Sequence, residues 1–322
     1  LNNNFLVTIP GSIGDLSSLQ FLNLNYNTLI SLPGELCNIY SGLTFSVSDN
    51  DICPGAYPTC IIDIEGQTCT HCPPNYFLIE GYCAWESDYN ILQNFLDINE
   101  ESLVGGDDVS DLDSEHWWDE GRLIEITLEF KQLTSEIPSN FGDLDKLKIL
   151  RLQGNDLAGT IPENITNLIN LEKLVLANNN LTGNIPEDIG VLMNLDTLWL
   201  NHNNFLGEIP ASITNINEMQ HFQLNSNNLT GNIPEDIGNM NKLQYLHLED
   251  NQLSGEIPQS VGSLINLIRL YLLNNNLSGQ IPESICNLDT LRSYLDNNQL
   301  CPPYPECLPT GYIGNQNTSG CE

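Results

Sequence analysis

Aromatic, histidine, arginine and glutamine side chains recur at one spacing in the second half of the sequence. Six of them form three pairs whose members are two residues apart, successive pairs are 24 residues apart, and Trp199 lies 24 residues before Gln223. The set comprises Trp199, His221, Gln223, Tyr245, His247, Arg269 and Tyr271. Aromatic and arginine side chains are the usual anchors of protein interfaces, and aromatic rings also stack on sugar rings. The chemistry that they indicate is the binding of a protein or a glycan.

A spacing of two residues places both members of a pair on the same side of a β-strand. If such strands lie side by side at a step of 24 residues, the seven side chains form one contiguous patch. We predict that this patch binds the ligand. A second interpretation stays open, because exposed strands carry aromatic residues for their β-propensity alone.

The histidines do not form an evident metal site. His221 and His247 would lie roughly 8 Å apart between Cα atoms, but no third ligand accompanies them. His202 and His221 would be about 17 Å apart, which is too far for them to share an ion. We therefore predict no metal and no cofactor.

Motifs of catalysis are absent from the sequence. It contains no nucleophile elbow, phosphate-binding loop or H-E-x-x-H segment. Five acidic residues fall close together, but they lack the D-x-[DN]-x-[DN]-G pattern of a calcium loop, which favours a solvated acidic loop. These residues are Asp107, Asp108, Asp111, Asp113 and Glu115. We expect a binding protein and not an enzyme.

Ten cysteines lie in two zones, and the stretch between Cys83 and Cys286 holds none. They are Cys37, Cys53, Cys60, Cys69, Cys72, Cys83, Cys286, Cys301, Cys307 and Cys321. An even number of clustered cysteines predicts disulfides and an oxidising compartment. Zinc is the alternative at the C-x-x-C segment Cys69–Cys72, but no second C-x-x-C completes a four-ligand site. We predict an extracellular or cell-surface location.

A repeat of 24 residues must position the candidate patch. Leucine or methionine opens each unit, apolar residues follow at offsets 3 and 5, asparagine at 8, an apolar residue at 10, usually glycine at 12, and Ile-Pro at 14 and 15. The opening residues are Leu123, Leu147, Leu171, Leu195, Met219, Leu243, Leu267 and Leu291. The first part of a unit alternates as a short strand does, and stacked units bury a continuous leucine column. The asparagines at offset 8 form a ladder whose amides satisfy buried turn backbone.

At these residues the chain resembles the L-x-G-x-I-P class of leucine-rich repeats. Plant receptor-kinase ectodomains, polygalacturonase-inhibiting proteins and secreted bacterial surface proteins carry such repeats. The resemblance covers about 180 residues of the second array, and it implies an α/β solenoid with a parallel sheet on the concave face, a second smaller sheet and a superhelical twist. It does not specify the ligand, because these solenoids bind peptides, proteins and glycans alike.

Two arrays share this code, and each ends in a similar cysteine-containing cap. We expect residues 1–69 to be the end of a first array with its cap, 70–86 a cysteine-closed linker, and 87–122 the N-terminal cap of the second array. Residues 123–300 are the second array and 301–322 its C-terminal disulfide cap. From Ser87 onward, apolar residues at three- and four-residue steps predict a helix in the N-terminal cap.

The cap spacing predicts which cysteines meet. Cys307 falls one coil beyond the position of Cys286, close enough for a disulfide at the spacing of neighbouring strands. We predict Cys286–Cys307 and Cys37–Cys60, which leaves Cys301–Cys321 and Cys53–Cys69. Four cysteines allow three connectivities, so the other pairings stay open.

The composition limits the partners. The chain carries 42 acidic and 9 basic residues, a formal charge of -33, which disfavours nucleic acid and anionic lipid. No apolar stretch is long enough to span a membrane. We predict an extracellular binding, adhesion or recognition module that uses the concave face of the second array. The alternative is self-association: residue 1 falls inside a repeat, and an uncapped array end could assemble head-to-tail into an extracellular filament or surface layer.

Overall fold

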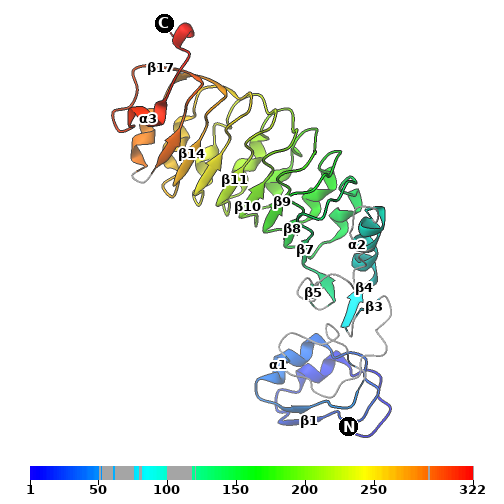
Figure 1. The fold of residues 1–322 in the computed structure, drawn as a ribbon. Helices are drawn as coiled ribbons and strands as arrows, with labels where there is room; N and C mark the ends of the chain where they lie inside the picture. The colour runs from blue at the N-terminus through cyan, green and yellow to red at the C-terminus, as the bar shows by residue number, and fades with distance from the viewer. Residues whose placement is uncertain are drawn as a thin grey trace. The chain divides into compact units, whose positions relative to one another are not determined.

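The chain forms two compact units, residues 1–97 with 105–125 and residues 98–104 with 126–322 (Figure 1). The computed structural model describes residues 1–50, 52, 61, 76–79, 82–99, 118–119, 121–288 and 291–321. Cys53, Cys60, Cys69 and Cys72 lie outside these ranges, so the predicted pairs Cys37–Cys60 and Cys53–Cys69 are not described. The acidic stretch 107–115 also lies outside them. Cys37 itself is disulfide-bonded. No helix in the described ranges is long and apolar enough to cross a membrane.

The first unit begins with short repeats that follow the same code as the long array. Strand β1 pairs in parallel with β2, and the Asn50 amide donates to the carbonyl oxygens of Leu24 and Val47, both at 2.9 Å. This is the expected role of the repeat asparagine. The elements are η1 Gly11–Asp15, β1 Phe21–Asn23, η2 Gly34–Leu36, α1 Cys37–Tyr40, β2 Thr44–Ser46, β3 Tyr76–Ile79, β4 Tyr82–Trp85, α2 Glu86–Ile98, β5 Trp118–Asp119 and β6 Arg122–Leu123.

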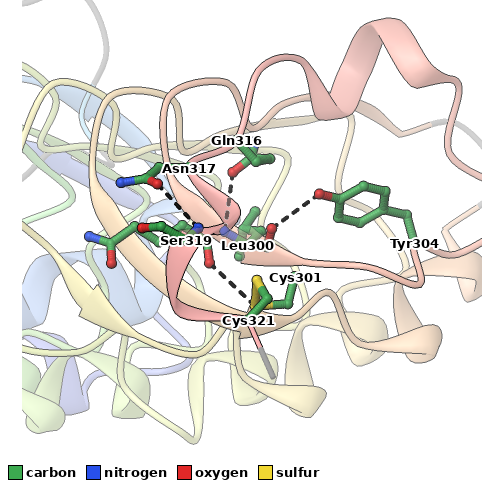
Figure 2. Close-up of a disulfide and its surroundings, with 8 residues drawn as sticks. Leu300, Cys301, Tyr304, Gln316, Asn317, Ser319 and Cys321 are labelled. Carbon is green, nitrogen blue, oxygen red and sulfur yellow. Dashed lines mark hydrogen bonds between the residues drawn. A yellow bond between two sulfur atoms is a disulfide. The ribbon is translucent and has the colours of Figure 1, made fainter.

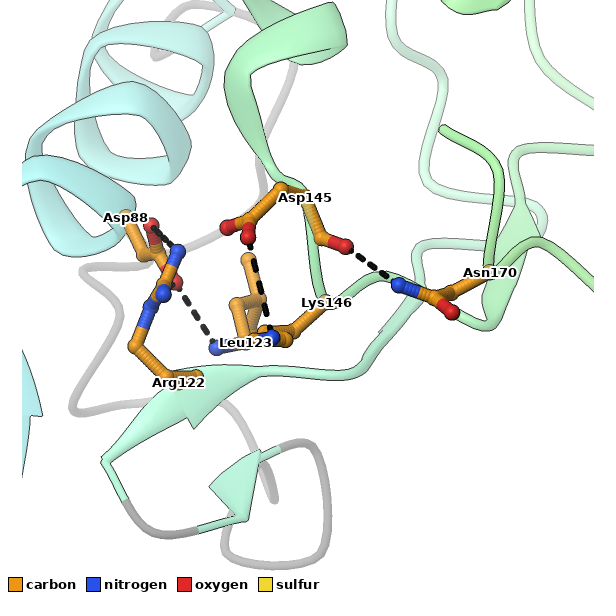
Figure 3. Close-up of polar contacts among 6 residues, drawn as sticks. All are labelled: Asp88, Arg122, Leu123, Asp145, Lys146 and Asn170. Atoms are coloured by element: carbon orange, nitrogen blue, oxygen red, sulfur yellow. Dashed lines mark hydrogen bonds and ion pairs between the residues drawn. The ribbon is translucent and has the colours of Figure 1, made fainter. Parts of the chain in front are cut away.

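The helix predicted in the N-terminal cap is α2, and it buries Leu92, Phe95 and Leu96 at the expected spacing. Asp88 fixes this helix to β6. Its side chain is 1% exposed. The Asp88 carboxylate accepts a hydrogen bond from Arg122 Nε at 2.9 Å and another from the Leu123 backbone amide at 3.0 Å (Figure 3). A charge this deeply buried is tolerated because it is both ion-paired and hydrogen-bonded.

Eight parallel strands form the main sheet of the second array, and neighbours in the chain are neighbours in the sheet. They are β7 Glu125–Thr127, β8 Ile149–Arg151, β9 Lys173–Val175, β10 Thr197–Trp199, β11 His221–Gln223, β12 Tyr245–His247, β14 Arg269–Tyr271 and β16 Arg292–Tyr294. The central residue of each strand points into the core, and the first and third point away from it. We call the surface of these outward residues the sheet face.

The asparagine ladder has the predicted role. The Asn203 side chain, for example, donates to the carbonyl oxygens of Leu176 at 2.9 Å and Leu200 at 3.1 Å and accepts the Leu181 amide at 3.0 Å. One side chain thus satisfies backbone groups in its own coil and in the preceding coil. Because the atoms are buried, these hydrogen bonds fix the spacing between coils.

A smaller parallel sheet lies beyond the ladder, as the resemblance implied. It consists of β13 Ser254–Gly255, β15 Asn276–Gln280 and β17 Gln299–Cys301. The glycine at offset 12 has a φ of +74° at Gly255 and +71° at Gly279, a left-handed conformation that favours glycine. The chain then returns through 3-10 helices: η5 Ser139–Asp143, η6 Glu163–Asn167, η7 Ile189–Val191, η8 Ala211–Asn215, η9 Ile237–Asn239, η10 Gln259–Ser263 and η11 Glu283–Asn287.

Two disulfides close the C-terminal end, together with α3 Thr310–Ile313 and η12 Thr318–Gly320. Cys286 bonds to Cys307 with 5.6 Å between Cα atoms, and Cys301 bonds to Cys321 with 5.5 Å. These are the pairs expected from the cap spacing. Figure 2 shows the second bond beside Gln316, which accepts the Leu300 amide at 3.2 Å. Gln316 also donates to the Leu295 carbonyl at 2.8 Å, so it performs in the cap the role that asparagine performs in the coils.

Candidate binding surface

The structure brings the seven predicted side chains together on the sheet face. They occupy the first and third positions of β10, β11, β12 and β14, where they are half-buried. The register aligns His221 with Tyr245 and Gln223 with His247 on neighbouring strands. The predicted contiguity is therefore present, and its use in binding stays a prediction.

The rings in this patch contact one another in a continuous series. His221 stacks on Tyr245 with 4.9 Å between ring centroids and 9° between planes. His247 stacks on Tyr271 at 4.5 Å and 15°. The Arg269 guanidinium lies over the Tyr245 ring, 5.5 Å from its centroid. Tyr245 thus has His221 and Arg269 as neighbours, which gives the surface a defined arrangement of ring edges and polar groups.

Two rings that the sequence analysis missed extend the series to the C-terminal cap. Tyr294 of β16 lies 4.9 Å from Tyr271, and Tyr312 of α3 lies 6.1 Å from Tyr294. Tyr271 and Tyr294 are paired in the sheet register, although they are 23 residues apart and the repeat has 24 residues. We call the full series the ring cluster: Trp199, His221, Tyr245, His247, Tyr271, Tyr294 and Tyr312.

A depression of about 480 Å³ adjoins the N-terminal end of the ring cluster. Trp199 and His221 line one side of it, and Lys173 and Arg151 line another. Its size is in the range of sites that hold a small ligand or one anchoring side chain. The sheet face therefore carries both the ring cluster and a recess beside it.

Burial shifts the pKa values of the two histidines of the ring cluster and of the nearby Glu249. It lowers the pKa of His247 to about 4, with a further lowering by the positive charge of Arg269. It also lowers the pKa of His221, against the opposing effect of Asp196. Burial raises the pKa of the Glu249 carboxyl to about 7, although a backbone hydrogen bond opposes the change. At neutral pH both imidazoles are therefore uncharged and Glu249 is partly protonated.

The cations of the sheet face differ in their partners. Arg151 lies 4.0 Å from the Glu129 carboxylate, and Lys173 lies 3.9 Å from that of Asp196. Within the described residues, Arg269 and Arg292 have no carboxylate at ion-pair distance. Also within the described ranges, no group of three or more His, Cys, Asp or Glu side chains is arranged to hold a metal ion.

Family models of leucine-rich repeats match the second array. A two-copy model matches residues 169–215, and a single-repeat model matches residues 146–168, 218–240, 242–264 and 266–288. No curated protein matches the chain. Together with the sheet and its repeat register, these matches show that the second array is built of leucine-rich repeats.

Solved structures of similar fold include receptor ectodomains. One is the ectodomain of the plant membrane receptor kinase GASSHO1/SCHENGEN3 from Arabidopsis thaliana, in complex with CASPARIAN STRIP INTEGRITY FACTOR 2. It matches with a TM-score of 0.53 and 30% identity, and the match covers 93% of this chain and 32% of that chain. Another is the plant peptide hormone receptor RGFR1 in complex with RGF2. It matches with a TM-score of 0.53 and 27% identity, over 93% of this chain and 47% of that chain. This chain thus spans a third to a half of their length.

A bacterial structure is similar to the same extent. The leucine-rich-repeat protein LIC12759 of Leptospira interrogans matches with a TM-score of 0.51 and 27% identity, over 92% of this chain and 71% of that chain. The fold is therefore shared by plant receptors and a bacterial protein, and the fold alone does not identify a ligand.

Proposed function

We propose that this protein is an extracellular recognition module that binds a peptide or protein ligand on the sheet face of its second array. The observation that carries the proposal is the ring cluster, which runs without a break from Trp199 on β10 to Tyr312 in the cap. Aromatic side chains supply large contact areas with few rotatable bonds, so they lose little conformational entropy when a ligand binds.

The packing of the rings favours a polypeptide over a glycan. A sugar ring stacks on the open face of an aromatic ring, but His221 covers one face of Tyr245 and the Arg269 guanidinium lies over the same ring. His247 likewise covers a face of Tyr271. The cluster therefore presents ring edges and hydroxyl groups, which suit the alternating donors and acceptors of a peptide backbone.

Two further findings support an extracellular recognition role. The disulfides Cys286–Cys307 and Cys301–Cys321 require an oxidising environment to form and persist. Two similar structures are the ectodomain of a plant membrane receptor kinase in complex with CASPARIAN STRIP INTEGRITY FACTOR 2 and a plant peptide hormone receptor in complex with RGF2. Both findings suit a protein that meets its ligand outside the cell.

The direct test uses a display library of random 16-residue peptides, selected on the intact protein. The variant Trp199→Ala/Tyr245→Ala/Tyr271→Ala should weaken the affinity of the selected peptides about a hundredfold, because each ring is a hot-spot residue worth about 1 kcal/mol or more. Affinity is measured by calorimetry, and circular dichroism verifies that the variant is folded.

A matched control removes three large side chains from elsewhere in the same array. Ile169, Met193 and Ile265 lie outside the sheet face, and they are 59%, 62% and 73% exposed. Their joint replacement by alanine should change the affinity by less than about threefold. If the selected peptides bound Trp199→Ala/Tyr245→Ala/Tyr271→Ala and the wild type with equal affinity, the ligand would bind elsewhere, which would contradict the proposal.

A further inference from the structure

The distribution of basic residues is the starting point. Only 9 of the 322 residues are Lys or Arg, against 42 Asp and Glu. Four of the nine nevertheless lie on the sheet face, at the first or third position of a strand: Arg151, Lys173, Arg269 and Arg292.

Two of these four cations are already neutralised. Arg151 faces Glu129 at 4.0 Å, and Lys173 faces Asp196 at 3.9 Å. Both pairs lie towards the N-terminal end of the array, beside the depression. An anionic ligand would gain little there, because these carboxylates compete for the same donors.

Arg269 and Arg292 are different. The sheet register places them directly opposite each other on β14 and β16, so their Cα atoms are neighbours at the strand spacing of about 5 Å. No carboxylate in the described part of the chain lies within ion-pair distance of either guanidinium. Like charges directly opposite each other across a sheet are destabilising. A carboxylate supplied by a ligand is therefore a favourable counter-charge for the pair.

The surroundings of the pair suit a buried contact with an anion. Tyr271 and Tyr294 occupy the third positions of the same two strands, 4.9 Å apart between ring centroids. Arg269 is oriented by its contact with the Tyr245 ring. Its positive field also reaches His247, whose pKa it lowers in addition to the effect of burial. A ligand that covers these rings would exclude water from the two guanidinium groups, which strengthens their attraction for a negative charge.

We propose that Arg269 and Arg292 together bind an acidic side chain of the peptide ligand, at the C-terminal end of the ring cluster. Two guanidinium groups hold one carboxylate through charge-assisted hydrogen bonds with defined geometry. The contact sets the register of the ligand on the sheet face, with one end at the arginine pair and the other towards Trp199. This inference rests on the proposed peptide binding and adds the chemical class of the ligand.

The experiment separates side-chain carboxylates from chain ends. The library peptides are N-acetylated and C-terminally amidated, so that Asp and Glu are their sole carboxylates. Selection on the wild-type protein should enrich Asp or Glu at one position, and Arg269→Gln/Arg292→Gln should abolish that enrichment. A selected peptide should bind this variant about tenfold more weakly. Replacing the acidic residue of the peptide by the matching amide (Asn or Gln) should weaken its affinity for the wild type by the same factor. The same replacement should not weaken its affinity for the variant any further.

The control variant, Lys146→Gln/Lys242→Gln, removes the same charge from the same array but outside the sheet face. Its affinity should stay within about threefold of the wild type, because both of those cations already have carboxylate partners and neither lies on the sheet face. Equal losses in the two variants would show a general charge effect and overturn the inference.

The remaining outcomes are distinct. Selected peptides that depend on the ring cluster but show no acidic preference would overturn this inference and leave the proposed function standing. A selection that enriches no peptide would overturn both. Displacement of the selected peptides by a polyuronate, with loss of polyuronate binding in Arg269→Gln/Arg292→Gln, would assign the pair to an acidic glycan and overturn the peptide assignment.

Discussion

Asn203→Leu should lower the free energy of unfolding by about 4 kcal/mol, the largest loss that we expect from one substitution in the array. The Asn203 side chain, 8% exposed, serves two carbonyl oxygens and one amide of two coils. Leucine fills the space but leaves those groups buried without hydrogen bonds, at about 1–3 kcal/mol each. Because each coil is stabilised by its neighbours, the defect uncouples the coils on its two sides.

Urea unfolding followed by circular dichroism measures this loss. Asn204→Leu is the matched control, because Asn204 is exposed and its replacement should change the free energy by less than about 0.5 kcal/mol. A loss below 1 kcal/mol for Asn203→Leu would show that the asparagine ladder is not what fixes the coil spacing.

Gly190→Ala should cost about 3 kcal/mol, although it adds a single methyl group. Gly190 is buried in η7, and a Cβ atom built there would collide with the backbone carbonyl oxygen of Ser212 in the next coil. Backbone cannot rotate away as a flexible side chain can, so the two coils must separate. The separation strains the hydrogen bond from the Gly190 amide to Ser212 Oγ, which is 3.2 Å long.

Gly311→Ala provides the comparison for this second prediction. Gly311 lies in α3 of the same unit with no atom within 4 Å of an added Cβ. Alanine should leave stability unchanged or raise it by up to about 1 kcal/mol, because it is the better helix former. The thermal midpoint of Gly190→Ala should therefore fall, while that of Gly311→Ala stays the same or rises. An unchanged midpoint for Gly190→Ala would contradict the close approach of the coils.

The fold was predictable because one spacing repeats. A step of 24 residues assigns strand, ladder and return segments in every coil at once, so one correct unit predicts the others. Asn203 and its equivalents could be placed inside the coils for this reason. The C-terminal disulfides followed from the same register, since Cys307 falls one coil beyond Cys286.

The missed residues lie where the repeat is interrupted. Tyr294 belongs to the shortened coil, and a strict 24-residue offset from Tyr271 points to Leu295, which is buried. Shifting the register by one residue, as the deletion in that coil requires, would have found Tyr294. Tyr312 and Gln316 lie in the cap, where no repeat position predicts them, and their roles follow from tertiary contacts.

The ion-pair partners of the cations on the sheet face could not be predicted from the sequence either. Arg151 and Arg269 occupy similar strand positions, yet one has a carboxylate partner and the other lies over a tyrosine ring. Side-chain rotamers decide between such partners, and a repeat pattern does not specify rotamers. The unpartnered arginine pair could therefore be recognised only in the structure.

The central claim is that ligand recognition takes place on the sheet face of the second array. A crystal structure of the protein with a peptide selected from the display library tests it most directly. We predict that the peptide crosses β10 to β16, contacts the ring cluster, and places an acidic side chain between Arg269 and Arg292. A peptide seated instead on the return segments, or on the smaller sheet of β13, β15 and β17, would contradict the claim.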